Sequence, residues 1–160
     1  MKKIAVFVDV QNVYYTTKER YNRNFDYNAF WKLISKDCEI VKAVAYAIDK
    51  HDEKQKQFQH ILKSIGFEIK LKPYIQRNDG SAKGDWDVGI TLDVMEYSKT
   101  ADKVILVSGD GDFDLLAEKV KRDFSVEFDV YGVPTLTAQS LIDAASKYIP
   151  IKENLLMNQK

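Results

Sequence analysis

The stretch Val104-Ile105-Leu106-Val107-Ser108-Gly109-Asp110-Gly111-Asp112-Phe113-Asp114 decides the fold of this chain. Its first four residues form an apolar, largely β-branched run bounded by turn residues, which is typical of a strand buried on both faces of a parallel sheet. After the turn, apolar residues recur at the spacing of one helix face, at Phe113, Leu116, Ala117 and Val120. Asp110 and Asp112 are therefore predicted to lie at the carboxyl end of a buried strand, the edge at which open α/β sheets bind ligands.

The rest of the chain alternates between strand patterns and helix patterns. Strands are predicted at residues 4–8, 40–48, 67–71, 104–107 and 126–130. Helices are predicted around residues 14–20, after an N-cap at Asp26, before a stop at Gly66, over 85–98, from Phe113 onward, and finally through Leu141, Ala144, Ala145 and Tyr148 to a stop at Pro150. Residues 73–84 are predicted to form a polar loop with a turn at Asn78-Asp79-Gly80. This alternation predicts a three-layer α/β/α sandwich around a mostly parallel, five-stranded sheet.

The composition limits the size and the class of the protein. With 160 residues, of which 45% are hydrophobic, we expect one domain over residues 1–150 and a loose polar tail over residues 151–160. The 24 basic and 24 acidic side chains cancel, so a nucleic-acid partner would have to be held by local patches. Cys38 is the only cysteine, which excludes an internal disulfide and a thiolate-rich zinc site and favours a reducing compartment.

No targeting or membrane segment is predicted. The apolar run at residues 4–8 is shorter than the roughly 7–15 residues of a signal-peptide core. No stretch reaches the length that spans a membrane. We therefore expect a cytoplasmic protein without a membrane partner.

Four carboxylates are predicted to meet at one edge of the sheet. Asp9 and Asn12 follow the first strand, and Asp87 lies in the first turn of the helix at residues 85–98. Clustered carboxylates repel one another, and a divalent cation removes that conflict. Ligand sets made only of oxygen suit Mg²⁺ or Mn²⁺. The sequence thus predicts a Mg²⁺ or Mn²⁺ site made by Asp9, Asp87, Asp110 and Asp112, with Asn12 and Ser108 in support.

Each of these acids also has an ordinary structural explanation. Asp110 or Asp112 alone is explained as a helix N-cap, and Asp87 as a helix-start acid favoured by the helix dipole. Asp9 is harder to explain in this way, because a carboxylate at the end of a buried strand costs several kcal/mol unless it is paired or bound to a metal. The convergence of all four favours the site over the separate explanations.

Three other motif assignments fail on particular residues. An EF-hand loop starting at Asp110 would need Gly and Glu where the chain has Leu115 and Lys121. A phosphatase that forms an aspartyl phosphate would need a second Asp at the position of Gln11. A dinucleotide-binding fold would need G-x-G-x-x-G after residues 4–8, where there is no glycine.

Three motifs carry a resemblance to a known family. They are Phe7-Val8-Asp9-Val10-Gln11-Asn12, then Lys83-Gly84-Asp85-Trp86-Asp87-Val88 with Asp93 downstream, and then Ser108-Gly109-Asp110-Gly111-Asp112-Phe113. Over about residues 3–148, the chain resembles the NYN domain, in its LabA-like branch, part of the PIN-like nuclease superfamily. The resemblance implies that the four aspartates bind metal with Asn12 in support, and that Lys83 and Asp93 are further motif positions. It also implies the strand order 3-2-1-4-5, which would set the strand of Asp9 beside that of Asp110.

Together, the residues and the resemblance predict a metal-dependent ribonuclease that hydrolyses RNA phosphodiester bonds. Aromatic rings and positive charges that suit single-stranded RNA interleave at Tyr14, Tyr15, Lys18, Arg20, Tyr21 and Arg23. Arg77 and Lys83 are expected to contact phosphates from the other side. Two alternatives stay open: a non-catalytic RNA-binding or regulatory protein with the same fold, and a small-molecule phosphohydrolase that uses the same ions. The sequence also leaves a homodimer open.

Overall fold

The computed structural model describes residues 1–73, 75–76, 82–83 and 85–158. Its main sheet has six strands, all parallel, in the order β3-β2-β1-β6-β7-β8. The strands are β1 (Lys2–Asp9), β2 (Cys38–Asp49), β3 (Glu68–Pro73), β6 (Lys103–Val107), β7 (Glu127–Gly132) and β8 (Lys147–Pro150). The strand order is the expected one with a sixth strand added at the edge.

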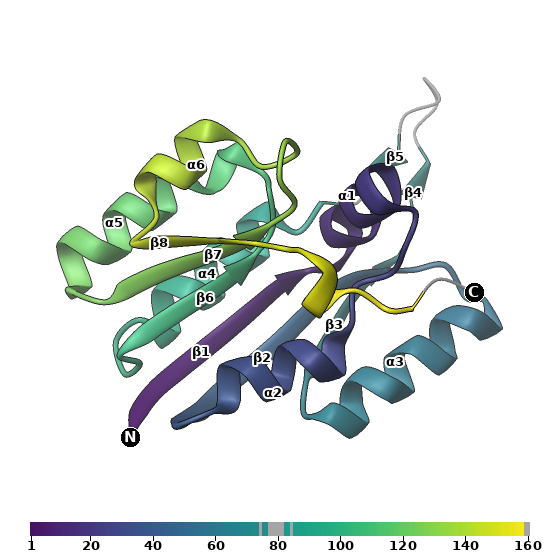
Figure 1. The fold of residues 1–160 in the computed structure, drawn as a ribbon, viewed down its shortest axis with the longest axis horizontal. Helices are drawn as coiled ribbons and strands as arrows, with labels where there is room; N and C mark the ends of the chain where they lie inside the picture. Colours follow the sequence, from purple (N-terminus) through teal and green to yellow (C-terminus); the bar gives the residue numbers. More distant parts are fainter. Residues whose placement is uncertain (74, 77–81, 84, 159–160) are drawn as a thin grey trace.

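Helices cover the two faces of this sheet (Figure 1). The helices are α1 (Val10–Tyr21), α2 (Tyr27–Ser35), α3 (Glu53–Ile65), α4 (Asp87–Tyr97), α5 (Asp114–Phe124) and α6 (Gln139–Ala144). One core packs side chains of α1, α2 and α3 against the sheet, and a second core packs those of α4, α5 and α6 against the opposite face. The three-layer prediction is confirmed. No helix in the part of the chain that the structure describes is long and apolar enough to cross a membrane.

The central strand explains why the sheet is buried on both faces. Residues Ile4–Val8 of β1 are all buried, and successive side chains enter the two cores in turn, with Val6 in one and Phe7 in the other. β1 pairs with β2 on one side and with β6 on the other. An uninterrupted apolar run is the pattern that a strand in this position needs.

Two predicted helix ends are confirmed. Asp26 caps α2, because its side chain accepts a hydrogen bond from the Ala29 N–H at 3.0 Å. Gly66 ends α3 with a φ of 137°, a backbone conformation that favours glycine.

The predicted last helix is wrong at its C-terminal end, where a sixth strand takes its place. α6 ends at Ala144, and Ser146 then pairs with β7: its N–H donates to the Phe128 carbonyl at 2.7 Å, and its Oγ accepts from the Phe128 N–H at 2.9 Å. Tyr148, predicted on the helix, lies in β8 and donates its hydroxyl to the Gly132 carbonyl at 3.1 Å. Pairing with β7 therefore overrides a helical spacing in this segment.

The described part of the tail is not loose, in contrast to the prediction. Ile151 and Leu155 are each 1% exposed and belong to the core on the α1–α3 side. Leu156 forms a β-bridge with Phe25, and Arg23 forms an ion pair with Glu153 at 2.6 Å. The apolar side chains of the segment explain why it packs against the sheet instead of remaining in solvent.

The predicted loop at residues 73–84 contains a short hairpin. β4 (Ile75–Gln76) pairs antiparallel with β5 (Ala82–Lys83) as a separate two-stranded sheet. The predicted turn at Asn78-Asp79-Gly80 lies outside the described residues.

Candidate metal centre

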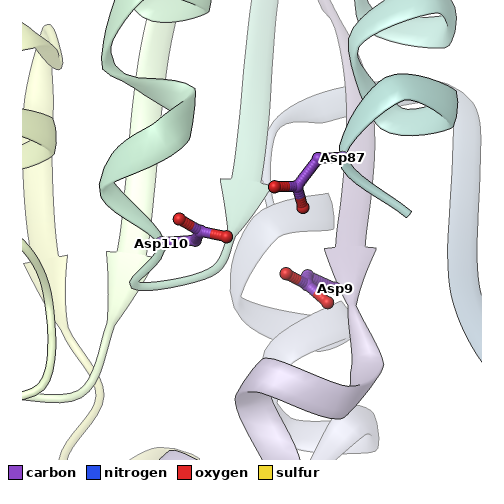
Figure 2. A group of neighbouring side chains, drawn as sticks. All are labelled: Asp9, Asp87 and Asp110. Atoms are coloured by element: carbon purple, nitrogen blue, oxygen red, sulfur yellow. The ribbon is translucent and has the colours of Figure 1, made fainter. Parts of the chain in front are cut away.

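Three aspartates from distant parts of the chain meet at the carboxyl edge of the sheet. Asp9 is the last residue of β1, Asp87 is the first residue of α4, and Asp110 lies in the turn between β6 and the short helix η1 (Gly111–Phe113). The pairing of β1 with β6 matches Val8 with Val107, so both strands end at the same level. One carboxylate oxygen from each aspartate lies within 4.8 Å of those of the other two, and the side chains face a common space (Figure 2).

Hydrogen bonds hold the Asp9 carboxylate and the backbone of the turn that carries Asp110. Ser108, which is buried, donates its hydroxyl to Asp9 Oδ2 at 3.1 Å and accepts the Asp110 N–H at 3.2 Å. Asn12 Oδ1 accepts the Gly109 N–H at 2.9 Å. The two residues predicted to support the site thus join the start of α1 to the turn that carries Asp110.

Burial and mutual repulsion disfavour the charged forms of two of the aspartates. The pKa of Asp9 is raised to about 6, chiefly by burial and also by the charges of Asp110 and Asp85, while hydrogen bonds from Ser108 and from the Asn12 backbone act in the opposite direction. The pKa of Asp87 is raised to about 7, first by burial and then by the charges of Asp110, Asp85, Asp9 and Asp112. A divalent cation among these oxygens would reverse both effects, because it favours the ionised carboxylates.

The family of the chain follows from a comparison of its sequence with known proteins. A profile of the NYN domain matches residues 3–152. The chain belongs to the NYN domain family. The predicted resemblance is confirmed. Asp9, Asp87 and Asp110 each come from one of the three motifs on which that resemblance was based.

Two relatives of this NYN domain extend the comparison. The low amplitude and bright protein LabA of Synechococcus elongatus is 24% identical over 159 residues, which cover 94% of this chain and 84% of LabA. A crystal structure of a Vibrio parahaemolyticus protein of unknown function is 58% identical. It superimposes with a TM-score of 0.93 over 98% of this chain and 96% of the other.

Asp112 lies next to the three aspartates of the NYN domain but outside their group. It is exposed on η1, and its N–H donates to Asp110 Oδ1 at 2.9 Å. With Asp87, it lies on an open pocket of ≈ 180 Å³ whose other lining residues are Val88, Thr91, Leu92 and Phe113. The structure thus places Asp112 beside the site, where its charge acts on Asp87.

Asp93 lies away from the centre, although the resemblance made it a motif position. Its Oδ2 accepts hydrogen bonds from the Tyr46 hydroxyl at 2.6 Å and from Lys70 Nζ at 2.7 Å. Tyr46 belongs to β2 and Lys70 to β3. The contacts of Asp93 therefore attach α4 to the sheet.

The residues predicted to bind RNA divide into three groups. On α1, Tyr14 and Tyr15 are about half exposed, and Lys18 Nζ lies 5.8 Å from the Tyr14 ring centre. Arg20 lies 5.3 Å from the ring of Tyr21, whose hydroxyl donates to the Ile151 carbonyl at 2.7 Å.

The other two groups are Arg23 on one hand, and Lys83 with Arg77 on the other. Arg23 is taken up by the tail, because it donates to the Met157 carbonyl at 2.7 Å as well as pairing with Glu153. Lys83 is in β5, and Arg77 lies outside the described residues.

Asp85 is a further acidic residue whose charge acts on the site, and it was not among the residues predicted from the sequence. Its Oδ1 accepts the Asp87 N–H at 3.2 Å, and its charge raises the pKa of both Asp9 and Asp87. The signal was present in the sequence, since Asp85 precedes the first residue of a helix by two positions, where a side-chain oxygen caps a free N–H.

Proposed function

We propose that this NYN domain is a metal-dependent ribonuclease that hydrolyses phosphodiester bonds in RNA. The observation that supports this proposal is the group formed by Asp9, Asp87 and Asp110, whose carboxylate oxygens lie within 4.8 Å of one another. A protein that only bound the anionic backbone of RNA would gain nothing from clustered carboxylates at that place. A metal-dependent nuclease needs such carboxylates, because they hold the cation.

The chemistry of the donor set fits Mg²⁺ or Mn²⁺. The three ligands are hard carboxylate oxygens, and the charged forms of Asp9 and Asp87 are disfavoured without a counter-ion. When bound, such a cation supplies Lewis-acid chemistry: it neutralises charge on the scissile phosphate and makes a water molecule a stronger nucleophile.

The side chains of the site have separate tasks in this proposal. Asp9, Asp87 and Asp110 bind the cation, and Ser108 orients Asp9 through its hydrogen bond to Oδ2. Asp112, exposed beside them, accepts the proton of the attacking water at its carboxylate.

The aromatic residues of α1 are proposed to bind single-stranded RNA. Tyr14 lies five residues beyond Asp9, about 7 Å along the helix axis. Exposed rings with Lys18 alongside suit the stacking of bases and contact with phosphates. Arg77 and Lys83 remain sequence-based proposals for further phosphate contacts.

The test compares metal-dependent cleavage in two matched variants. Labelled single-stranded RNA, DNA of the same sequence and a phosphomonoester are incubated with the protein and Mn²⁺, Mg²⁺ or EDTA. Asp110→Asn should abolish the cleavage of RNA. Asp114→Asn is the control, because Asp114 lies four residues further on and its Oδ1 accepts the Leu115 N–H at 2.6 Å.

Each outcome separates the proposal from its alternatives. RNA cleavage that needs the cation, is lost in Asp110→Asn and is retained in Asp114→Asn supports a ribonuclease. RNA binding without cleavage contradicts it and favours a non-catalytic RNA-binding protein. Cleavage of the phosphomonoester alone favours a small-molecule phosphohydrolase.

A further inference from the structure

We propose that Trp86 sets the position of Asp87 in the metal centre. It does so through contacts with Tyr46, Lys72 and Gly89, which together with Trp86 are called the Trp86 cluster below. The inference rests on the proposed function, since it concerns the affinity of the same three aspartates for a cation.

The indole of Trp86 is attached to the sheet by three contacts. Its Nε1–H donates to the Ala47 carbonyl at 2.9 Å. Its ring lies 5.4 Å from that of Tyr46, centre to centre, and Lys72 Nζ lies 4.5 Å from the centre of the Trp86 rings. Ala47 and Tyr46 belong to β2, and Lys72 belongs to β3. The residue just before α4 is therefore tied to two strands.

Gly89 makes room for the indole within the first turn of α4. A Cβ at this position would lie 2.6 Å from Trp86 Cε3, closer than Cβ atoms come to non-bonded atoms in proteins, and 3.0 Å from Cζ3. The ring has little freedom to move aside, because the contacts with Ala47, Tyr46 and Lys72 hold it. Glycine is less favourable than alanine inside a helix, so the close approach gives a physical reason for its presence.

The backbone around Asp87 is held by the same group of residues. Lys72 Nζ donates to the Asp85 carbonyl at 3.1 Å, and Asp85 Oδ1 accepts the Asp87 N–H at 3.2 Å. The Trp86 carbonyl accepts the Ile90 N–H at 2.8 Å, which begins the helix. Asp87 is thereby placed relative to β2 and β3, whereas Asp9 and Asp110 are placed by β1 and β6.

Because Asp87 is positioned by other strands than Asp9 and Asp110, the Trp86 cluster determines the distance between Asp87 and the other two ligands. Two of the carboxylates follow paired strands, but the third reaches the site from the start of a helix. A shift of the indole would move the start of α4 and with it the Asp87 carboxylate. Cations bind weakly when one ligand is displaced. Substituting a residue that orients a ligand typically lowers metal affinity by about 10–100-fold.

The test measures the Mn²⁺ dissociation constant by isothermal titration calorimetry. Trp86→Phe removes the indole N–H, and Gly89→Ala adds the Cβ that meets the ring. Each should weaken Mn²⁺ binding by about 10-fold. Val88→Ala is the matched control, because the Val88 side chain is 70% exposed between them, and it should bind Mn²⁺ like the wild type.

A second control separates positioning from general destabilisation. Val94→Ala removes two buried methyl groups from the same helix, two turns away, and should lower the melting temperature without changing Mn²⁺ affinity. In a Trp86→Ala background, Gly89→Ala should weaken binding no further, because the ring that it displaces is gone. All titrations are made at a temperature at which circular dichroism shows each variant folded.

The outcomes distinguish this inference from the proposed function. If the wild type binds Mn²⁺, Asp110→Asn does not, and both Trp86→Phe and Gly89→Ala bind within twofold of the wild type, the role of Trp86 is overturned and the metal centre stands. If Asp110→Asn binds Mn²⁺ as well as the wild type does, the metal centre and the role of Trp86 are both overturned. Should Trp86→Phe fail to fold, Gly89→Ala, which retains every side chain of the cluster, decides alone.

Discussion

Replacing Asp9 by asparagine should stabilise the metal-free protein at pH 7.5. The Asp9 carboxylate is largely withdrawn from solvent, and its pKa is raised from 3.8 to about 6, chiefly by burial. At pH 7.5 the folded protein must therefore keep a charge that it disfavours. Asparagine removes the charge and keeps an oxygen that can accept the Ser108 hydroxyl.

The size of the effect follows from the shift of the pKa. A rise of about two pKa units corresponds to about 3 kcal/mol of lost stability once the group is fully ionised, at 1.36 kcal/mol per unit. Part of the shift comes from Asp110 and Asp85, whose charges solvent screens, so we expect a gain of about 2 kcal/mol. For a domain of this size, that gain raises the melting temperature by roughly 4–8 °C.

The pH dependence has a definite sign. Because the folded pKa lies above the unfolded one, the folded state binds more protons between about pH 4 and pH 6. The wild-type protein therefore loses stability as the pH rises through that window, and the share due to Asp9 is absent in Asp9→Asn. The advantage of the variant should be full at pH 7.5 and fall to roughly a third at pH 4.5.

The assay is thermal unfolding in EDTA at both pH values. Asp143→Asn, an exposed aspartate of α6 that accepts a hydrogen bond from Gln139 at 2.8 Å, should show no such advantage. Saturating Mn²⁺ should stabilise the wild type and not Asp9→Asn. A variant that is less stable than the wild type in EDTA at pH 7.5, or an advantage that persists unchanged at pH 4.5, would refute the argument.

Three further predictions concern stability and are checked by urea unfolding. Removing residues 151–160 should cost about 4 kcal/mol, because two fully buried side chains are lost from the core, and an unchanged midpoint would contradict the packing of the tail. Tyr46→Phe should cost about 1 kcal/mol, because Asp93 loses one of its two donors, and a neutral result would mean that the hydroxyl is not bonded in solution. Gly109→Ala should cost about 1–3 kcal/mol, because its Cβ would collide with the Leu136 carbonyl oxygen; equal stability would show that the turn can relax.

The aspartates at strand ends were predictable because their strands are fully buried. The runs 4–8, directly before Asp9, and 104–107, three residues before Asp110, are apolar and buried at every position, and a carboxylate that closely follows such a run lies at the sheet edge. Their nearness depends on the strand order, which came from the resemblance to a family and not from any spacing in the chain.

Long-range contacts explain what sequence reasoning could not see. The helical spacing through Tyr148 is accidental, because pairing with β7 decides the structure of that segment. Arg23 looks like an RNA contact in its local sequence, yet its partner Glu153 lies 130 residues away. Asp93 could have been separated from the site by geometry, since six residues of helix place it about 120° around the axis from Asp87 and about 9 Å along it.

The strand order has a mechanical consequence. Residues 1–73 build β1, β2 and β3, residues 103–150 build β6, β7 and β8, and the two halves of the sheet join only where β1 pairs with β6 in the part that the structure describes. Asp9 belongs to the first half and Asp110 to the second. A cation bound by both residues would link the two halves and stabilise the pairing of β1 with β6. Amide hydrogens along the β1–β6 pairing should then exchange more slowly with solvent in Mn²⁺ than in EDTA, so occupancy of the centre could be followed without any substrate.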